Sequence, residues 1–468
     1  MIKTRFSPSP TGLMHLGNAR TALFCVLYAQ GQKGTFMLRI EDTDKERSRD
    51  EYTVAMMRDL RWLGWQWQEG PEVGGNAEPY YQSQRQGIYD EYYHHLEADG
   101  RAYVCFCSEA QLALARKVQL ASGQPPRYPG TCRHLTAEEI AAKRILGLQP
   151  TLRFRVPEKT TVRFNDIVHG EQTFNTDDLG DFIIRRTDGT SPFMYCNAID
   201  DALMGVTHVI RGQDHLANTP RQIMILEALK LNIPHYGHIS LILGSDGSPL
   251  SKRNGSRSVG ELREMGYLPI AVNNYLSRLG HYFENPSFMT FAELAQAFDF
   301  SHLSKSPARF DADQLLHWQK EAIARLSDDE FWCWLGDDIK QAVPQTAQAI
   351  FVQGVRPNIV FPEDAKVWIE RLFNDALVYD EEAETILRAT NKTFFDVAIE
   401  AVNTHGTDYA AVCEALKTKA NVKGKGLFQP LRYAVTGVAH GPELVHIFTL
   451  LGRDGLLKRF QEAQKIAM

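Results

Sequence analysis

The sequence has no run of about 18 apolar residues, which is the shortest stretch expected to cross a membrane as a helix. Its first residues, 1–6, include no long apolar stretch and no small-residue cleavage site, so they do not resemble a secretory signal. Cysteine is scarce: the 468 residues include seven, an odd number scattered along the chain. This usage argues against a disulfide framework and for a reducing compartment. We therefore expect a cytoplasmic protein.

The sequence also lacks the basic excess that is typical of proteins covered with nucleic-acid contacts. Its net charge is −6, and its content of 44% hydrophobic and 23% charged residues is ordinary for a globular protein. Any nucleic-acid contact must therefore come from locally concentrated basic residues. We find no internal repeat and no low-complexity tract. A chain of 468 residues is too long for one hydrophobic core, so several domains are expected.

The periodicity predicts an α/β protein with a helical C-terminal part. Strand, helix and strand alternate at the start, which indicates a parallel βαβ unit, and this pattern returns after about residue 190. Strands fade after about Phe291. The elements expected are a strand over Thr4–Phe6, a helix over Asn18–Gln30 capped by Gly31, a strand over Thr35–Ile40, a helix over Asp50–Leu63, short strands such as Leu152–Val156, and a helix over Thr219–Leu231 with Thr219 as N-cap.

A Pro/Gly loop followed by a helix makes the N-terminus a candidate nucleotide site. The loop starts at Pro8 and leads into His15-Leu16-Gly17-Asn18. A helix N-terminus presents unpaired N–H groups that bind anions such as phosphate. Gly17 would let a base or ribose approach the backbone, and His15 could donate to phosphate oxygens. The alternative is a capped helix that follows a surface turn.

A second segment, Ser248-Pro249-Leu250-Ser251-Lys252-Arg253-Asn254-Gly255, offers a lysine on a glycine-flanked loop. Such a lysine can close over a triphosphate and stabilise the charge that grows in the transition state. Taken alone, a Ser-Lys-Arg triplet is nearly always a surface loop.

The two segments, in this order and about 240 residues apart, resemble the ATP-binding signatures of class I aminoacyl-tRNA synthetases. The prefix Pro8-Ser9-Pro10-Thr11-Gly12 and the stretch Arg39-Ile40-Glu41-Asp42-Thr43-Asp44 resemble bacterial glutamyl-tRNA synthetases in particular, including non-discriminating and second-copy types. The resemblance covers almost the whole chain. It is most specific over residues 5–47 and 195–255.

The resemblance implies a Rossmann-type class I catalytic domain with an inserted acceptor-binding domain, followed by all-α anticodon-binding domains. The boundaries we expect are 1–80 and 186–240 for the Rossmann catalytic domain, 81–185 for the inserted acceptor-end-binding domain with a zinc site, 241–320 for the stem-contact domain with the Ser-Lys loop, and 321–375 and 376–468 for two helical anticodon-binding domains.

The implied activity is ATP-dependent ligation of L-glutamate to the 3′-terminal adenosine of tRNA(Glu) through glutamyl-adenylate, with Mg²⁺, by a monomer. The residues carried over for catalysis are His15, Gly17 and Lys252. Those for ATP are Ser7, Pro8, Ser9, Pro10, Thr11, Gly12, His15, Gly17, Asn18, Asp214, Leu250, Ser251, Lys252 and Arg253. Those for glutamate are Arg5, Ser7, Ser9, Glu41, Asn197 and Arg211. Those for tRNA are Asp44, Arg47, Lys305, Arg356, Lys423 and Lys425.

The residue types favour glutamate as the amino acid. Two arginines in one pocket, Arg5 and Arg211, suit a substrate with two carboxylates, whereas Glu41 can take an ammonium group. Which arginine meets which carboxylate is left open. Taken alone, Arg211 fits a structural ion pair equally well. The segment Arg39 to Arg47, with its carboxylates and arginines, also suits a zwitterion, although a solvated charged loop would look the same.

Cys105-x-Cys107, followed after 24 residues by Cys132-x-His134, supplies four ligands for a closed tetrahedral zinc site. We expect one structural Zn²⁺, because all four ligands come from the protein. The alternative is free thiols beside a surface histidine. The other cysteines, Cys25, Cys196, Cys333 and Cys413, have no partners at metal spacing.

The sequence departs from the family pattern at two places. Pro249 stands where many relatives have a lysine, so Arg253 or Arg257 would have to supply that phosphate contact. Near Arg356-Pro357-Asn358, relatives that accept only tRNA(Glu) often carry an arginine that reads the last anticodon base. The short loop favours charging of tRNA(Gln) as well, unless Arg356 does the reading.

Three other functions are alternatives to this activity. A glutamylating enzyme that modifies a tRNA base would be short, which the residues after Ser306 contradict. Glutaminyl enzymes end in β-barrels, whereas this C-terminal half is expected to be helical. A non-catalytic RNA-binding paralogue is disfavoured by a set of retained residues: His15, Gly17, Glu41, Arg211 and Lys252.

Overall fold

The computed structural model describes residues 1–44, 46–250, 257–374 and 377–467. The chain forms two compact units, which are treated separately below. The first comprises Met1–Glu264 and Val272–Ala312, and the second comprises Met265–Ala271 and Asp313–Met468. Within the described residues, we find no helix with the length and apolarity needed to cross a membrane.

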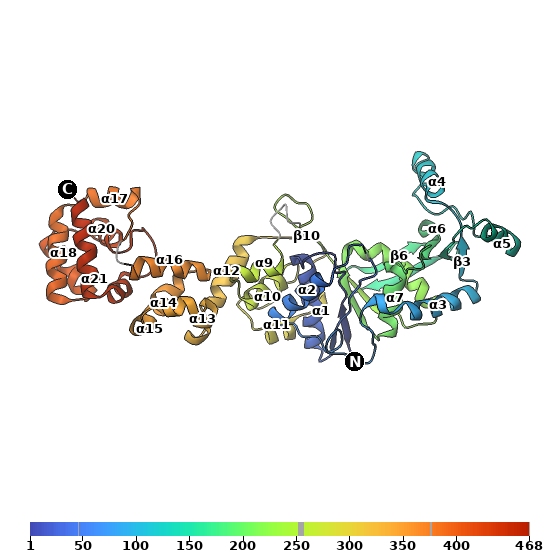
Figure 1. Cartoon of the computed structure of the whole chain (residues 1–468), viewed down its shortest axis with the longest axis horizontal. Coiled ribbons are helices and arrows are strands. Elements are labelled where there is room, and N and C mark those ends of the chain that lie inside the picture. The colour runs from blue at the N-terminus through green and yellow to red at the C-terminus, as the bar shows by residue number, and fades with distance from the viewer. Residues whose placement is uncertain (45, 251–256, 375–376, 468) are drawn as a thin grey trace. The chain divides into compact units, whose positions relative to one another are not determined.

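A parallel four-stranded sheet in the order β2-β1-β8-β9 forms the centre of the first unit (Figure 1). Strand β1 pairs in parallel with both β2 and β8, and α1 connects β1 to β2, so the predicted βαβ unit is confirmed. The Ala/Leu-rich α1 buries most of its residues because it packs against β1 and α11. The elements are β1 (Lys3–Phe6), α1 (Leu16–Gly31), β2 (Thr35–Leu38), α2 (Asp50–Trp62), α7 (Phe193–Leu203), β8 (His208–Gly212), α8 (Thr219–Ala228) and β9 (His235–Ile239).

An antiparallel sheet in the order β3-β4-β7 and a separate hairpin, β5–β6, lie between the two halves of the parallel sheet in sequence. One hydrophobic core contains residues of this segment and of the parallel sheet, and within it the rings of Tyr93 in α3 and Tyr195 in α7 stack at 4.3 Å. The elements are α3 (Gln86–Ala98), β3 (Ala102–Cys105), α4 (Glu109–Ala121), α5 (Ala137–Ile145), β4 (Thr151–Phe154), β5 (Thr161–Asp166), β6 (Gly170–Asn175), α6 (Thr176–Leu179) and β7 (Phe182–Arg185).

Two helix caps differ from the expected ones. Gly31 is the last residue of helix α1, Gln32 is its C-cap, and Lys33 adopts positive φ. Thr219 is the first residue of α8, and Asn218 precedes it as N-cap. The hydroxyl of Thr219 hydrogen-bonds buried side chains of the neighbouring strands instead of capping the helix.

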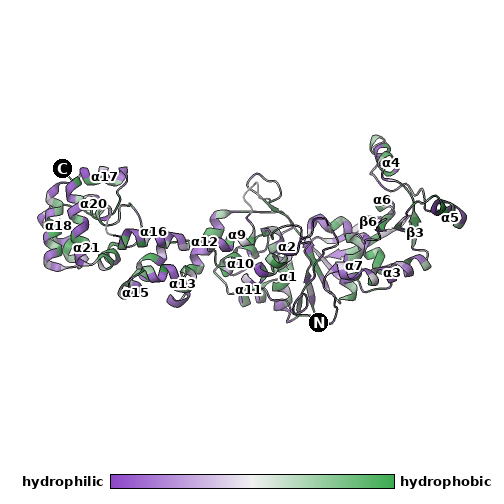
Figure 2. Ribbon diagram, in the orientation of Figure 1, coloured by the Kyte–Doolittle hydropathy of each residue, from purple (hydrophilic) through white to green (hydrophobic). Residues whose placement is uncertain are grey.

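The second unit is helical throughout its described residues, as expected for the C-terminal half. Its core is built from the apolar faces of its helices. Hydrophilic and hydrophobic residues alternate in bands along helices such as α18 and α21 (Figure 2). The first unit ends with β10 (Ile242–Leu243), α9 (Val259–Glu264), most of α10 (Pro269–Arg278), α11 (Phe291–Ala297) and β11 (Ala308–Arg309). The helices that follow are α12 (Ala312–Ile323), α13 (Asp328–Leu335), α14 (Asp337–Ala342), α15 (Gln348–Val355), α16 (Pro362–Phe373), α17 (Glu381–Arg388), α18 (Lys392–His405), α19 (Tyr409–Lys419), α20 (Lys425–Thr436) and α21 (Leu444–Ile466).

Candidate active site

A cavity of about 510 Å³ opens at the carboxyl ends of β1 and β8. The strand order reverses between these two strands, and such switch points are where open α/β sheets bind ligands. The size lies within the usual range for small-molecule sites, roughly 300–1,000 Å³.

Most residues proposed from the sequence for ATP and glutamate meet in this cavity. Pro10 and Gly12 do not line it, and Ser251, Lys252 and Arg253 lie outside the described residues. The proposed residues that do line it are Arg5, Ser7, Pro8, Ser9, Thr11, His15, Gly17, Asn18, Glu41, Asn197, Arg211, Asp214 and Leu250.

His15 forms the N-cap of α1 and lines the cavity. Its Nδ1 accepts a hydrogen bond from the backbone N–H of Asn18 at 3.4 Å. Burial lowers the pKa of His15, which favours the neutral ring. With Nδ1 acting as acceptor, the proton of the neutral ring lies on Nε2, which is then free to donate to a phosphate oxygen.

The two signature segments lie against each other in space. His15 forms an isolated antiparallel bridge with Ser258, and the N–H of Val259 donates to the carbonyl of Met14 at 2.9 Å. On the other side of the undescribed residues 251–256, Pro249 and Leu250 line the cavity. The segment after residues 251–256 therefore contacts the nucleotide loop, and the segment before them lines the same cavity.

Among the described residues that line the cavity, three polar side-chain atoms lack a hydrogen-bond partner. They are Oγ of Ser7, Nε of Arg20 and Nη1 of Arg211, and all three are shielded from solvent. The remaining guanidinium nitrogens of Arg211 are occupied, because Nε donates to Nε2 of His238 at 3.1 Å and Nη2 donates to Oγ1 of Thr219 at 2.8 Å. A buried donor without a partner costs about 1–3 kcal/mol, so these atoms favour a polar ligand.

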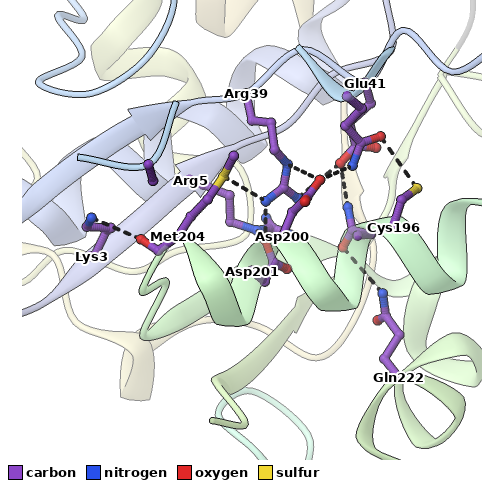
Figure 3. A network of polar contacts seen from close by, with 12 residues as sticks. Lys3, Arg5, Arg39, Glu41, Cys196, Asp200, Asp201, Met204 and Gln222 are labelled. Atoms are coloured by element: carbon purple, nitrogen blue, oxygen red, sulfur yellow. Dashed lines mark hydrogen bonds and ion pairs between the residues drawn. The ribbon is translucent and has the colours of Figure 1, made fainter. Parts of the chain in front are cut away.

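Arg5 is held at the base of the cavity by Asp201 (Figure 3). Its Nε donates to Oδ1 of Asp201 at 3.1 Å, and the same oxygen lies 2.8 Å from Nη1 of Arg39. Arg39 also approaches Glu41 at 3.3 Å and is completely buried. Within the segment Arg39 to Arg47, which suits a zwitterion by its residue types, Arg39 pairs with internal carboxylates and Glu41 is the described residue that lines the cavity.

Glu41 combines burial with a partly compensated charge. Its Oε1 accepts hydrogen bonds from Nδ2 of Asn197 and from Arg39. Burial raises the pKa of Glu41 to about 7, although Arg39 and Arg5 oppose that shift. A carboxylate with this pKa is poised to pair with an incoming ammonium group.

The cysteines proposed as zinc ligands also converge. The ligand atoms of Cys105, Cys107 and Cys132 lie within 4.8 Å of one another, and the sulfurs of Cys107 and Cys132 are 3.7 Å apart. In a tetrahedral site with Zn–S bonds of about 2.3 Å, sulfurs are separated by about 3.8 Å, so the spacing fits zinc.

The fourth expected ligand, His134, is exposed and is not among the clustered ligand groups of the described residues. The hydroxyl of Tyr128 lies there instead, 3.3 Å from Sγ of Cys105 and 3.7 Å from Sγ of Cys107. Sequence reasoning missed Tyr128, although it stands four residues before Cys132. Helices α4 and α5, which flank the cluster, contain no buried residue.

The residues proposed for tRNA do not line the cavity. Asp44 and Arg47 form an exposed ion pair at 2.7 Å, and Lys305, Lys423 and Lys425 are exposed. Asp214, proposed for adenosine, is 62% exposed at the cavity rim.

Arg356 differs from these exposed residues because its guanidinium is engaged. It donates to the carbonyl of Leu326 at 3.0 Å, pairs with Asp328 at 2.5 Å and lies over the ring of Phe331.

Comparisons with known proteins agree with this geometry. Residues 1–317 match the family described as tRNA synthetases class I (E and Q), catalytic domain, and residues 291–464 match an anticodon binding domain. Glutamate–tRNA ligase 2 of Coxiella burnetii (strain RSA 493 / Nine Mile phase I) is 54% identical over 463 residues, covering 99% of this chain and 100% of that one. Glutamate–tRNA ligase 2 of Nitrosococcus oceani is 54% identical over 460 residues, covering 98% of each chain.

A solved structure shows the same fold over the full length. The glutamate tRNA ligase from Elizabethkingia meningosepticum, crystallised in complex with its amino acid, superposes with a TM-score of 0.89 at 27% identity and covers 99% of each chain. The expected class, a Rossmann-type catalytic domain followed by a helical anticodon-binding part, is confirmed.

Proposed function

The chain belongs to the class I tRNA synthetases that act with glutamate or glutamine, and we propose that its cavity binds L-glutamate and ATP for transfer of glutamate to tRNA(Glu). The enzyme forms glutamyl-adenylate and pyrophosphate, with Mg²⁺ screening the phosphates. The acyl group then passes to the 2′-hydroxyl of the 3′-terminal adenosine. In both steps the protein contributes mainly positioning and electrostatic stabilisation.

The observation that carries this proposal is the unpartnered Nη1 of Arg211, buried in a wall that also holds Arg5 and Glu41. Arg211 supplies a free donor for one substrate carboxylate, and Arg5 supplies a second cation for the other. Glu41 takes the α-ammonium group. A glutamine side chain has no second carboxylate, so this charge pattern favours glutamate.

ATP takes the adjoining part of the cavity. The N-terminus of α1, with His15 and Gly17, lies where phosphates bind, and Asp214 at the rim meets the adenosine. Lys252, which lies outside the described residues, is assigned to the leaving pyrophosphate because the residues before its segment line the cavity and Ser258, after it, contacts His15.

A structural zinc ion belongs to the proposal, with Cys105, Cys107 and Cys132 as ligands and Tyr128 in place of His134. The ion would join the end of β3, the start of α4 and the loop before α5. Its role is to hold the acceptor-binding insertion in shape, because α4 and α5 have no core of their own.

We extend the proposal to tRNA(Gln) as a second acceptor. The arginine that could reject it, Arg356, already has its guanidinium bound to Leu326 and Asp328 within the helical unit. The exposed lysines, including Lys305, Lys423 and Lys425, would hold tRNA phosphates without reading sequence. The family alone supports two further features, namely that the enzyme acts as a monomer and that it acts in the cytoplasm.

Aminoacylation with labelled glutamate, run separately on purified tRNA(Glu) and tRNA(Gln), tests the function. We expect charging of both tRNAs, and charging of tRNA(Glu) alone would remove the second acceptor.

R211Q should lower kcat/KM for glutamate by at least about 100-fold, because a buried charge pair with the substrate is lost. R58Q, an exposed arginine on α2, is the matched control and should retain wild-type activity. Charging of neither tRNA would contradict the proposal.

A further inference from the structure

Arg211 is buried without a carboxylate of its own. It is 5% exposed, and within the described part of the chain its guanidinium hydrogen-bonds only neutral groups, His238 and Thr219. Burial lowers the pKa of Arg211 to about 10. Burying a cation without an anionic partner is costly. Neutral side chains must therefore hold the guanidinium in place and keep Nη1 directed toward the cavity.

His238 fixes the guanidinium from the neighbouring strand. Arg211 in β8 and His238 in β9 are direct register partners, so their side chains emerge on the same face of the sheet. Nε2 of His238 accepts from Nε of Arg211 at 3.1 Å, and Oγ1 of Thr219 lies 3.0 Å away. An imidazole can accept at Nε2 only if its proton is on Nδ1.

Asp166 fixes that tautomer. Its Oδ2 lies 2.6 Å from Nδ1 of His238, and both side chains are fully buried. Its Oδ1 accepts from the backbone N–H groups of Val168 and His169, each at 2.9 Å. Burial opposes ionisation, but these hydrogen bonds, with that from His238 foremost, hold the pKa of Asp166 below its usual range. The carboxylate is therefore charged and locked in one orientation.

We propose that Asp166 and His238 are positioning residues for glutamate recognition, in a relay in which the carboxylate sets the imidazole tautomer and the imidazole orients Arg211. This inference rests on the proposed function, because it assigns Arg211 to the amino acid. Asp166 ends β5 in the segment inserted between the two halves of the parallel sheet, and the N–H of Ile167 donates to the carbonyl of Tyr236 in β9 at 2.8 Å. The inserted hairpin thus reaches the amino-acid site through one hydrogen-bonded chain.

The substitution D166N distinguishes a relay, in which Asp166 sets the tautomer of His238, from a role of Asp166 in packing alone. The two backbone N–H groups require an oxygen at the Oδ1 position, so the amide of the new asparagine must turn its NH₂ toward His238. Nδ1 then becomes an acceptor and the ring proton moves to Nε2, where it opposes the N–H of Arg211. Shape and backbone hydrogen bonds are kept, whereas the orientation of Arg211 is lost.

Steady-state aminoacylation measures the effect. We expect D166N to raise KM for glutamate about tenfold or more, with KM for ATP and for tRNA within about threefold of wild type. H238L, which removes the hydrogen-bond acceptor, should raise KM for glutamate by a similar factor. H238Q places an amide oxygen near the former Nε2 and should restore most of the affinity. D166N added to H238Q should then change little, because a glutamine has no tautomer to set.

D178N is the matched control, an exposed aspartate of the same insertion, and should have no effect. The wild-type enzyme is the reference: its failure to charge tRNA would overturn the proposed function, whereas a wild-type glutamate KM in D166N would overturn the relay. Additive effects of D166N and H238Q would also overturn it.

Nitrogen-15 NMR of histidine-labelled wild type, assigned with H238Q, gives a test that needs no folded D166N. A proton on Nδ1 of His238 supports the relay, and a proton on Nε2 refutes it.

Discussion

A Cβ atom placed on Gly17 would lie 3.1 Å from both Cε1 and Nδ1 of the His15 ring. That distance is shorter than normal carbon contacts, so any side chain at position 17 displaces the ring. Gly17 therefore leaves room for the ring of the histidine two residues before it.

G17A should therefore lower ATP–pyrophosphate exchange by about tenfold to 100-fold, because small misplacements of a catalytic group are costly. Its stability should not fall, since alanine is favoured over glycine in a helix by up to about 1 kcal/mol. Exchange assayed with tRNA present, together with a thermal melt, checks both expectations. G87A in α3, where a Cβ meets open space, is the control. A G17A enzyme with wild-type exchange would contradict this role.

Glu41 should make glutamate recognition depend on pH. In the proposed site the ionised carboxylate pairs with the ammonium group, and burial raises the pKa of Glu41 to about 7. The ionised fraction therefore falls about tenfold for each unit of pH below that value. kcat/KM for glutamate should follow with a slope near one, whereas kcat/KM for ATP at saturating glutamate should change less. E41Q should be less active with a flat profile, and a flat profile in the wild type would contradict the assignment.

The carboxylate of Asp201 should be needed for folding as well as for activity. It faces Arg5 and Arg39, all three side chains are nearly inaccessible to solvent, and the two arginines hold the pKa of Asp201 below its usual range despite its burial. D201N leaves two buried cations short of a counter-charge, which costs about 3–5 kcal/mol. Urea unfolding of the first unit, followed by its tryptophans, measures the loss. D44N, which removes one partner of an exposed ion pair, should leave the midpoint unchanged.

The sequence predicts the parts of the fold and site that depend on local pattern. The βαβ start follows from alternation and from the Ala/Leu-rich helix, and the cavity residues His15, Gly17 and Glu41 follow from their motifs. The partners of the site arginines do not follow in this way. Asp166, His238 and Arg211 are far apart in the sequence. Arg211 meets His238 because β8 pairs with β9, and Asp166 joins them because β5 packs against β9. Asp201 becomes a counter-ion only once α7 brings it to Arg5 of β1 and to Arg39, the residue after β2, which no periodicity encodes.

The metal cluster is a second place where the sequence predicts only some of the contacts, and its fourth ligand can be tested directly. Spacing alone pairs Cys132 with His134, whereas packing brings Tyr128 to the sulfurs. We expect about one zinc per chain by atomic emission, in line with the closed site. C107S should lose the metal, Y128F should lower its affinity, and H134A should retain it. Because α4 and α5 have no buried residues, chelation should expose residues 106–150 to limited proteolysis while the catalytic sheet stays intact. Loss of zinc in H134A with full retention in Y128F would restore the histidine as the fourth ligand.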